Sequence, residues 1–478
     1  MGPQGYQAVL LAGGSGTNLF PLNQTGLPLS LLPVANQPLI TYPLRTLEGA
    51  GIVDVLVVCL GEATAAKVSS WISSNYSGKL HLKVKSVPED SESAEALRAV
   101  AEDITGKNIV VMSVDLITDV RLEALMAVHF IRSAMATVLL SQRRTSPSSE
   151  TKPGKAPKDV EYVGLDEQQQ QLLFFRPSSE SRRNIRLPMN ALLRHKRLTV
   201  RTDLRDNHLY IFNRAVLDVL QSKPSLANIK QDIIPYLVLH QHSRKARPGA
   251  QQALPAGATS ANGDAENGQR GSSDSLERVD SMLPPTSVAG QNFMALSHSA
   301  AAEEEQSRGN WYCGAFVVGK DSYCVRTSTL QSFCEVNREV INIELAGRLG
   351  VHAQPNTKFD NFLHDSVQMG YKTTVAAGCM VGRGTTMADK CSIKRSVLGA
   401  MCKLGSNVKI INCVLMDGVE VQDGCHLQNS IICHNAHLQE RVTLRDCQVG
   451  PGSIVSEGLE HREEVLAKAP QRRSSEYK

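Results

Sequence analysis

A constant spacing of 17 residues governs the apolar positions in the last hundred residues of the chain. Four series of apolar or small residues follow it: Ile393, Ile410, Leu427 and Leu444; Leu398, Leu415, Ile432 and Val449; Cys391, Val408, Cys425 and Val442; and Leu404, Val421, Leu438 and Val455. Repetition at a fixed period is the signature of solenoids, in which equivalent side chains of successive coils stack in one interior. This spacing leaves few ways for the region to fold.

Within each period the apolar residues return every four to six positions. Turn residues such as Gly405, Asn407 and Gly418 separate them. This pattern predicts a coil with three short sides, a β-helix built from hexapeptide-type coils, over residues 371–457. A β-sandwich of many short strands is the alternative, although a sandwich does not require a constant period.

The repeat also accounts for most of the cysteines. The chain has 11 of them, seven between residues 379 and 447, and none forms a C-x-x-C pair. Cys391 and Cys425 occupy interior series beside valines, so we interpret them as small apolar side chains in a reducing compartment. The alternative is a metal site made of neighbouring thiols and imidazoles, those of Cys425, His426, Cys433 and His434. Their spacing is not that of a zinc site.

The first part of the chain alternates apolar strands with helices. The expected strands are Tyr6–Leu11, Val53–Leu60, Leu82–Val87 and Ile109–Val114, and the expected helices are Pro38–Gly49, Ala63–Ser74 and Ala94–Asp103. Continuous apolar strands separated by helices predict an α/β, Rossmann-like domain with a mainly parallel sheet covered on both faces. Because such sheets bind ligands at the carboxyl ends of their strands, we expect a site in the loops after Leu11 and Val114.

Composition divides the chain into five parts. Residues 243–309 are rich in Ala, Gly, Ser, Pro, Gln and Glu, so they cannot bury enough apolar surface to offset their ordering entropy. We predict that this insertion is disordered, either as an inert linker or as a regulatory segment. The other expected parts are the α/β domain 1–242, a connecting segment 310–370, the β-helix 371–457 and a charged tail 458–478.

The N-terminal sequence and the charge exclude several classes of function. The start MGPQGYQAVLLAGG has no basic region, and its apolar run is too short for a signal peptide or a membrane span. The 51 basic and 47 acidic residues are interleaved and give a net charge of +4, which is no footprint for nucleic acid. We therefore expect a globular protein of the cytosol with no direct nucleic-acid or membrane partner.

One stretch of the first domain carries a detailed resemblance. Residues 11–39 read LAGGSGTNLFPLNQTGLPLSLLPVANQPL. This resembles the motif L-A-G-G-x-G-T-R-L-x-P-L...P-K-P-L-L-P-V-x-N-K-P-L of the nucleotidyltransferases that make sugar nucleotides, and of their relatives among translation factors. That family also combines an α/β domain with hexapeptide coils. The resemblance implies a nucleotidyltransferase-like first domain and a left-handed β-helix.

The resemblance also implies where the chemistry of the family takes place. Glycines let the backbone approach the phosphates, an arginine and a lysine stabilise charge as pyrophosphate leaves, and a strand-end aspartate holds Mg²⁺. Gly13, Gly14 and Gly16 match the family's glycines, and Asp115 stands at its metal position.

Three positions depart from the family pattern. Asn18 replaces the arginine, Leu29 replaces the lysine, and Glu92 adds bulk and negative charge where a glycine precedes a helix. Losing one donor of positive charge in the transition state typically slows a reaction by about 10²–10³. We therefore predict a degenerate pocket without pyrophosphorylase activity, and no catalytic residue, cofactor or metal ion.

Further segments narrow the resemblance. CSIKRSVLGAMCKLGSNVKIINCVLMDGVEV (391–421) and LQNSIICHNAHL (427–438) are similar to the gamma-subunit family of eukaryotic translation initiation factor 2B, the exchange factor that reloads initiation factor 2 with GTP. The resemblance implies three partners: an epsilon subunit, the other subunits of the complex, and initiation factor 2. The epsilon subunit resembles this chain but adds a helical-repeat exchange domain, whereas only about twenty residues follow the last coil here. The chain is expected to support exchange rather than to catalyse it.

Two other functions stay open. An active sugar-phosphate nucleotidyltransferase would need positive charge from elsewhere, such as Arg45 or Lys85. A nucleotide sensor would bind a nucleotide or sugar nucleotide without turnover, and Leu29 and Glu92 oppose it.

Overall fold

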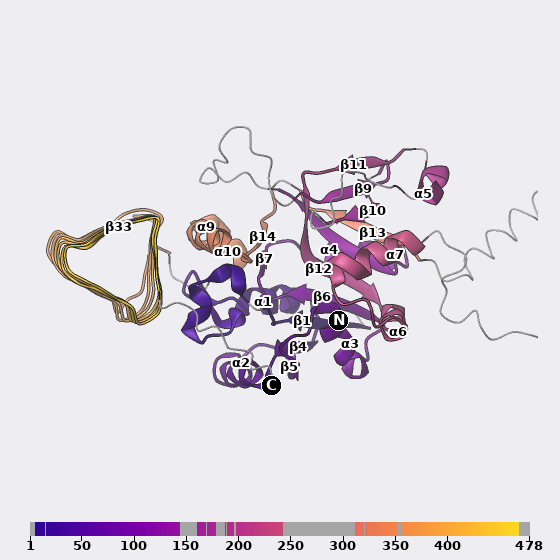
Figure 1. The fold of residues 1–478 in the computed structure, drawn as a ribbon, viewed down its shortest axis with the longest axis horizontal. Helices are drawn as coiled ribbons and strands as arrows, with labels where there is room; N and C mark the ends of the chain where they lie inside the picture. The colour runs from indigo at the N-terminus through magenta and orange to yellow at the C-terminus, as the bar shows by residue number, and fades with distance from the viewer. Residues whose placement is uncertain are drawn as a thin grey trace, which may run out of the picture.

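The computed structural model of the chain describes residues 5–14, 16–143, 160–168, 170–177, 187, 189–195, 197–241, 311–319, 321–351, 355–356 and 358–467. An α/β domain and a triangular coil lie side by side (Figure 1). The expected disordered insertion 243–309 and most of the charged tail, residues 468–478, lie outside the described residues.

The main sheet of the first domain is mainly parallel, as the sequence predicted. Its order is β13-β8-β12-β6-β1-β4-β5, and only β12 runs antiparallel to its neighbours within the described residues. The strands are β13 (Cys313–Val317), β8 (Ala136–Gln142), β12 (Leu204–Asn213), β6 (Asn108–Ser113), β1 (Tyr6–Leu11), β4 (Asp54–Leu60) and β5 (His81–Val87). Strand β13 shows that the segment 310–370, expected to connect the domains, also completes the sheet of the first one.

Helices cover both faces of this sheet because its strands are apolar on both sides. Val9 packs on the face covered by α3 (Ser93–Ala99), α6 (Ala215–Ser222) and α7 (Ile234–His240). Its neighbours Ala8 and Leu10 pack on the opposite face, against α1 (Thr41–Gly49), α2 (Glu62–Asn75) and α4 (Leu122–Ile131). The period of two along β1 thus divides one strand between two cores.

Smaller elements complete the first domain. They are the sheet β10 (Leu172–Arg176), β9 (Tyr162–Leu165) and β11 (Thr199–Arg201), the pair β14 (Cys324–Arg326) and β7 (Leu116–Thr118), the pair β2 (Pro33–Val34) and β3 (Gln37–Pro38), helices α5 (Met189–Arg194), α9 (Leu330–Val340) and α10 (Ile343–Leu349), the π-helix η6 (Ile229–Ile233), and the 3-10 helices η1 (Thr17–Leu19), η2 (Leu22–Thr25), η3 (Leu29–Leu31) and η4 (Ala101–Asp103). None of the helices described is both long and apolar enough to cross a membrane.

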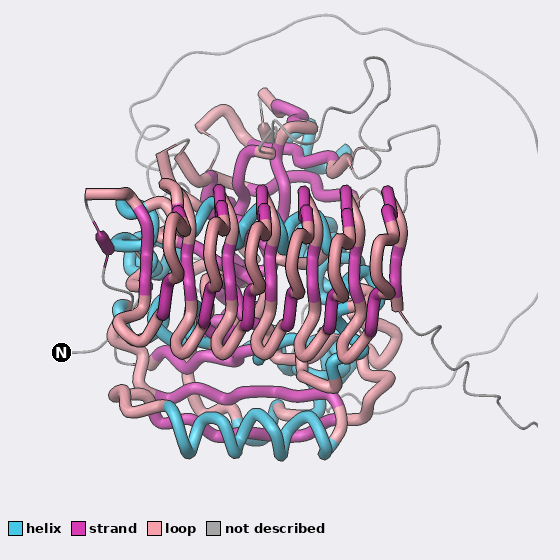
Figure 2. Tube along the Cα trace, turned by 90° about the vertical axis from the view of Figure 1, so that its left-hand side faces the viewer, coloured by secondary structure: helices cyan, strands magenta, loops and turns pink. Residues whose placement is uncertain are grey.

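Residues 358–467 form the β-helix, whose stacked coils Figure 2 shows from the side. Its first sheet contains β16 (Asn361–Leu363), β19 (Met380–Val381), β22 (Val397–Leu398), β25 (Val414–Leu415), β28 (Ile431–Ile432), β31 (Gln448–Val449) and β34 (Val465–Leu466), and β15 (Pro355–Asn356), which precedes the coils, pairs antiparallel with β16 at its edge. The second contains β17 (Gln368–Met369), β20 (Thr386–Met387), β23 (Lys403–Leu404), β26 (Glu420–Val421), β29 (His437–Leu438) and β32 (Ile454–Val455). The third contains β18 (Thr374–Val375), β21 (Ser392–Lys394), β24 (Lys409–Ile411), β27 (His426–Gln428), β30 (Thr443–Arg445) and β33 (Glu460–Arg462).

The 17-residue period becomes the register of these sheets. Ile393 pairs with Ile410, Ile410 with Leu427, and Leu427 with Leu444, and the other series stack in the same interior. The coils extend beyond the predicted 371–457 at both ends. The terminal coils were missed because polar residues interrupt the pattern there, as where His461 stacks on Leu444. All 11 cysteines are free thiols, and burial raises the pKa of Cys413 to about 12.

A hairpin of the first domain joins it to the β-helix. Strands β2 and β3 form this hairpin, and the backbone N–H of Ala35 at its tip donates to Asn337 Oδ1 of α9 at 3.0 Å. The neighbouring Asn36 Nδ2 donates to the carbonyl of Leu398 in the β-helix at 2.8 Å. Apolar residues of the hairpin, of α9 and of the outer face of the first β-helix sheet share one buried cluster. The second half of the family motif is therefore part of the junction between the domains.

Candidate functional site

The glycine loop borders a cavity of about 450 Å³ at the carboxyl end of β1. Gly13, Gly14 and Gly16 all line it, together with Leu29. A Cβ on Gly13 would lie 2.5 Å from Leu60 Cγ, so a larger residue there would collide with that side chain. Gly16 has a φ of 56°, a backbone conformation that favours glycine. The structure thus gathers these four of the predicted site residues around one cavity.

Leu29 places an apolar side chain where the family motif has a lysine. A Cβ built on Gly14 would lie 3.4 Å from Leu29 Cδ2, and Leu29 also packs against the buried clusters beneath the loop. Asn18, by contrast, is exposed in η1 and is absent from the described lining of the cavity. Neither position supplies positive charge to the glycine loop.

The cavity does contain a lysine that the sequence analysis missed. Lys67 of α2 lines it, and Lys67 Nζ lies 2.5 Å from the carbonyl oxygen of Gly26. Helix α2 follows β4 directly, so its first turns reach the carboxyl edge of the sheet, which was the signal available in the sequence. Glu89 and Asp90 line the same cavity, so carboxylates outnumber cations in its described lining.

The cations suggested from the sequence lie elsewhere. Lys85 Nζ forms an ion pair with Asp103 Oδ2 at 3.1 Å, and Arg45 Nη1 donates to Gln37 Oε1 at 2.9 Å. Neither residue is in the described lining of the glycine-loop cavity. The positive charge that an active enzyme would need is therefore not recruited from Arg45 or Lys85.

Glu92 caps a helix rather than filling the cavity. Its backbone N–H donates to Glu95 Oε2 at 2.9 Å in a capping box at the start of α3, and Asn228 Nδ2 donates to Glu92 Oε2 at 3.0 Å. Glu92 is absent from the described lining of the cavity. The bulk and negative charge expected from Glu92 are therefore not found in this cavity, whose acidic lining comes instead from Glu89 and Asp90.

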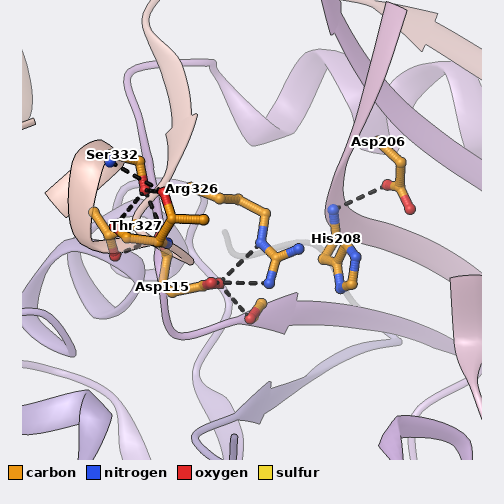
Figure 3. Close-up of polar contacts among 8 residues, drawn as sticks. Asp115, Asp206, His208, Arg326, Thr327 and Ser332 are labelled. Atoms are coloured by element: carbon orange, nitrogen blue, oxygen red, sulfur yellow. Dashed lines mark hydrogen bonds and ion pairs between the residues drawn. The ribbon is translucent and has the colours of Figure 1, made fainter. Parts of the chain in front are cut away.

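Asp115 is buried and paired with an arginine (Figure 3). Only 2% of the residue is exposed, and its two carboxylate oxygens accept from Arg326 Nε at 3.1 Å and Arg326 Nη2 at 2.8 Å. Ser113 Oγ also donates to Asp115 Oδ1 at 2.6 Å. Arg326 is the last residue of β14, which pairs with β7 just after Asp115. The pair joins residues 211 positions apart, so sequence patterns gave no sign of it.

The charges around Arg326 stabilise its guanidinium. Burial alone would lower the pKa of Arg326, but the carboxylates of Asp115 and Asp206 hold it above its usual value. His208 faces the guanidinium from the side opposite Asp115 (Figure 3). Burial, together with the charge of Arg326, keeps the pKa of His208 well below its usual value. The guanidinium is thus held between a carboxylate and a neutral imidazole.

The donors present do not fit a metal ion at this place. Mg²⁺ takes free carboxylate oxygens, whereas both oxygens of Asp115 already accept from Arg326. No cluster of three or more His, Cys, Asp or Glu suited to a metal exists among the described residues. The alternative zinc group does not converge either, because Cys425 lies inside the β-helix and Cys433 packs in the cluster with α9.

Fold and site together define a nucleotidyltransferase-like domain that carries a left-handed β-helix. The family model for nucleotidyl transferases matches residues 7–151, and the model described as the EIF2B subunit epsilon LbH domain matches residues 358–465. These matches confirm the fold class predicted from the sequence.

The particular relatives are gamma subunits of translation initiation factor eIF2B. The chain is 26% identical to that of Dictyostelium discoideum over 417 residues, covering 84% of this chain and 88% of the relative. It is 28% identical to that of Schizosaccharomyces pombe over 404 residues, covering 82% and 74%. It is 48% identical to the glucose-1-phosphate thymidylyltransferase of Neisseria gonorrhoeae, but over only 60 residues, which cover 13% of this chain and 20% of the relative. The chain is therefore a relative of the eIF2B gamma subunits, as its motifs predicted.

Proposed function

We propose that this chain is a non-catalytic subunit of the guanine-nucleotide exchange factor for translation initiation factor 2. It acts in the cytosol, pairs with an epsilon-type subunit, and supports GDP/GTP exchange rather than performing it. The similarity to two eIF2B gamma subunits over more than four-fifths of the chain supports this assignment. The organisation as a nucleotidyltransferase-like domain with an eIF2B-type β-helix supports it too.

The observation that carries the loss of enzyme activity is the pair of Asp115 and Arg326. A nucleotidyl transfer needs mobile or metal-borne positive charge on the phosphates, whereas this guanidinium is fixed on a buried carboxylate. Leu29 and the acidic lining of Glu89 and Asp90 add to the effect. The cavity keeps the shape of the glycine loop but holds little charge suited to a triphosphate.

A first experiment tests the loss of the reaction. The purified chain is incubated with each nucleoside triphosphate, a sugar 1-phosphate and Mg²⁺, and pyrophosphate release is measured. We expect none above background. We also expect none from the variant Asn18→Arg/Leu29→Lys/Glu92→Gly, because Arg326 still occupies Asp115. Turnover by the wild type would contradict the proposal, and turnover by the variant would show that the Asp115–Arg326 pair is not what closes the site.

A second experiment tests the role in exchange. The chain is co-expressed with an epsilon-type subunit, the complex is isolated by size exclusion, and GDP release from initiation factor 2 is followed. We expect a complex that exchanges faster than the epsilon-type subunit alone, while the chain alone stimulates nothing. If the two chains migrate separately and the rate does not change, the assignment fails.

A titration separates this role from that of a nucleotide sensor. GTP, ATP and GDP-mannose are titrated separately into the full chain. Because carboxylates outnumber cations in the described lining of the glycine-loop cavity, we expect no saturable binding there. Saturable binding that is lost in Lys67→Gln would favour the sensor instead.

A further inference from the structure

A second cavity of the first domain is lined by arginines. It measures about 700 Å³ and lies between α1, the loop that leads into α4, and the end of α10. Arg45, Arg121 and Arg348 line it, opposed by the carboxylates of Asp119 and Glu123. No described residue lines both this cavity and the one at the glycine loop. We name it the arginine cleft.

Arg45 contributes positive charge that the fold does not neutralise. It is half-buried, and Arg45 Nη1 donates to Gln37 Oε1, a neutral acceptor, at 2.9 Å. Burial lowers the pKa of Arg45, and Tyr42 and Glu48 offset this only in part. Glu48 Oε1 instead accepts from the backbone N–H of Lys79 at 3.0 Å. Throughout the described segments, no carboxylate lies within ion-pair distance of Arg45.

The other two arginines differ in what they do. Arg348 Nη2 pairs with Asp119 Oδ2 at 2.7 Å, and Asp119 Oδ1 also accepts from the backbone N–H of Tyr323 at 2.7 Å. This pair neutralises one of the two carboxylates and holds Arg348 in place. Arg121 is exposed just before the first residue of α4. Of the charged residues left in the lining, Arg45 and Arg121 are positive and Glu123 is negative, so the cleft has an excess of positive charge.

We propose that the arginine cleft binds a phosphate group, carried either by a small phosphate monoester or by a phosphorylated side chain of a partner. Guanidinium groups match the geometry of phosphate oxygens and bind them with paired, charge-assisted hydrogen bonds. A dianion would give Arg45 the counter-ion that the fold withholds, and Arg121 adds a second donor group at the open side. The inference does not depend on the proposed function, since it concerns different residues and a different ligand.

Calorimetric titration of the full chain at low ionic strength tests this proposal. The probes are inorganic phosphate, glucose 6-phosphate, a peptide with one phosphoserine, and the same peptide with glutamate in its place. We expect saturable binding of inorganic phosphate and of at least one monoester. The stronger of the two monoesters identifies the source of the phosphate. If only the glutamate peptide binds, the cleft takes an acidic protein surface and the proposal is wrong.

Variants locate the binding and control for folding. Arg45→Gln and Arg121→Gln should each weaken phosphate binding at least tenfold. Arg462→Gln removes the same charge from an exposed pair with Glu460 on the β-helix and should change it less than twofold. Thermal unfolding checks that all three variants fold. Absence of saturable phosphate binding, or equal weakening by Arg45→Gln and Arg462→Gln, would overturn the proposal.

Discussion

Arg326 and Arg45 both lie in the first domain, but their guanidinium groups have different hydrogen-bond partners there. Arg326 ends at the carboxylate of Asp115, which accepts from it with both oxygens. Arg45 ends at the amide oxygen of Gln37 and borders an open cleft. A buried charge with an internal partner cannot be removed alone without leaving that partner uncompensated, whereas a charge without one is available to a ligand. The two arginines therefore mark two different places: the residue that follows β6, Asp115, where the guanidinium has a charged internal partner, and the arginine cleft, where its partner is neutral.

The largest effect is expected from breaking the internal pair. Arg326→Met would leave the carboxylate of Asp115 buried without a counter-ion, which typically costs about 3–5 kcal/mol of stability. Urea denaturation of the full chain, followed by circular dichroism, measures this loss.

A double variant checks that the loss comes from the stranded carboxylate. Asp115→Asn/Arg326→Met removes both charges together, so it should recover a large part of the stability lost in the single variant. If Arg326→Met lies within about 1 kcal/mol of the wild type, the pair does not support the fold in the way the contrast requires.

Acid should destabilise the protein through a buried histidine that also lacks a counter-ion. Burial lowers the pKa of His129 to about 4, and His129 Nε2 has no partner among the described residues, while Nδ1 lies 2.9 Å from Thr137 Oγ1. Between pH 6.5 and 4 the unfolded chain binds a proton that the folded chain does not. The free energy of unfolding therefore decreases as the pH is lowered from 6.5 to 4, by about 3 kcal/mol for this one group.

Denaturant titrations at several pH values measure this slope. His129→Gln should reduce the slope by close to one proton, while His426→Gln, at an exposed position of β27 in the β-helix, should leave it unchanged. An equal slope in His129→Gln and the wild type would assign the acid sensitivity to other groups.

The sequence predicted the β-helix because its interior requires the same spacing that the structure uses as its register. Ile393 and Ile410 are 17 residues apart because one coil separates them, and this places them side by side in the same sheet. Part of the glycine loop could also be predicted from the sequence, since Gly16 has a φ of 56°, a backbone conformation that favours glycine. Local and periodic constraints leave traces in a sequence.

Contacts between segments that are distant in the sequence left no pattern from which they could be predicted. Arg326 lies 211 residues from Asp115 and reaches it only because β14 pairs with β7. Glu92 was read as an obstacle in the pocket, whereas its neighbours Glu95 and Asn228 show it to be a helix cap. The segment around Ala35 was matched only to a family motif, and the motif did not indicate that the hairpin tip contacts α9. In each case the deciding partner is set by the tertiary fold.

A medium effect is expected where the hairpin meets α9, because the partner there is internal but uncharged. Asn337→Ala would leave the buried N–H of Ala35 without an acceptor, and it would also remove the bond from Asn337 Nδ2 to the carbonyl of Phe333 at 2.9 Å. A buried unsatisfied N–H costs about 1–3 kcal/mol. Chemical denaturation measures the loss, and Asn342→Ala, at the exposed start of α10, controls for changes in helix capping. If Asn337→Ala loses no more stability than the control, the hairpin contact does not contribute to joining the domains.

The smallest effect on stability is expected in the arginine cleft, from the replacement of Arg45. Arg45→Gln should change stability by no more than about 0.5 kcal/mol in phosphate-free buffer, because no internal carboxylate loses its partner. Arg348→Gln, in the same cleft, should cost about 1–3 kcal/mol because Asp119 is left without its guanidinium. Thermal and urea unfolding of the two variants, side by side, measure the difference. A large loss from Arg45→Gln would mean that the fold itself uses this charge, and the cleft would then have no excess positive charge to offer a phosphate.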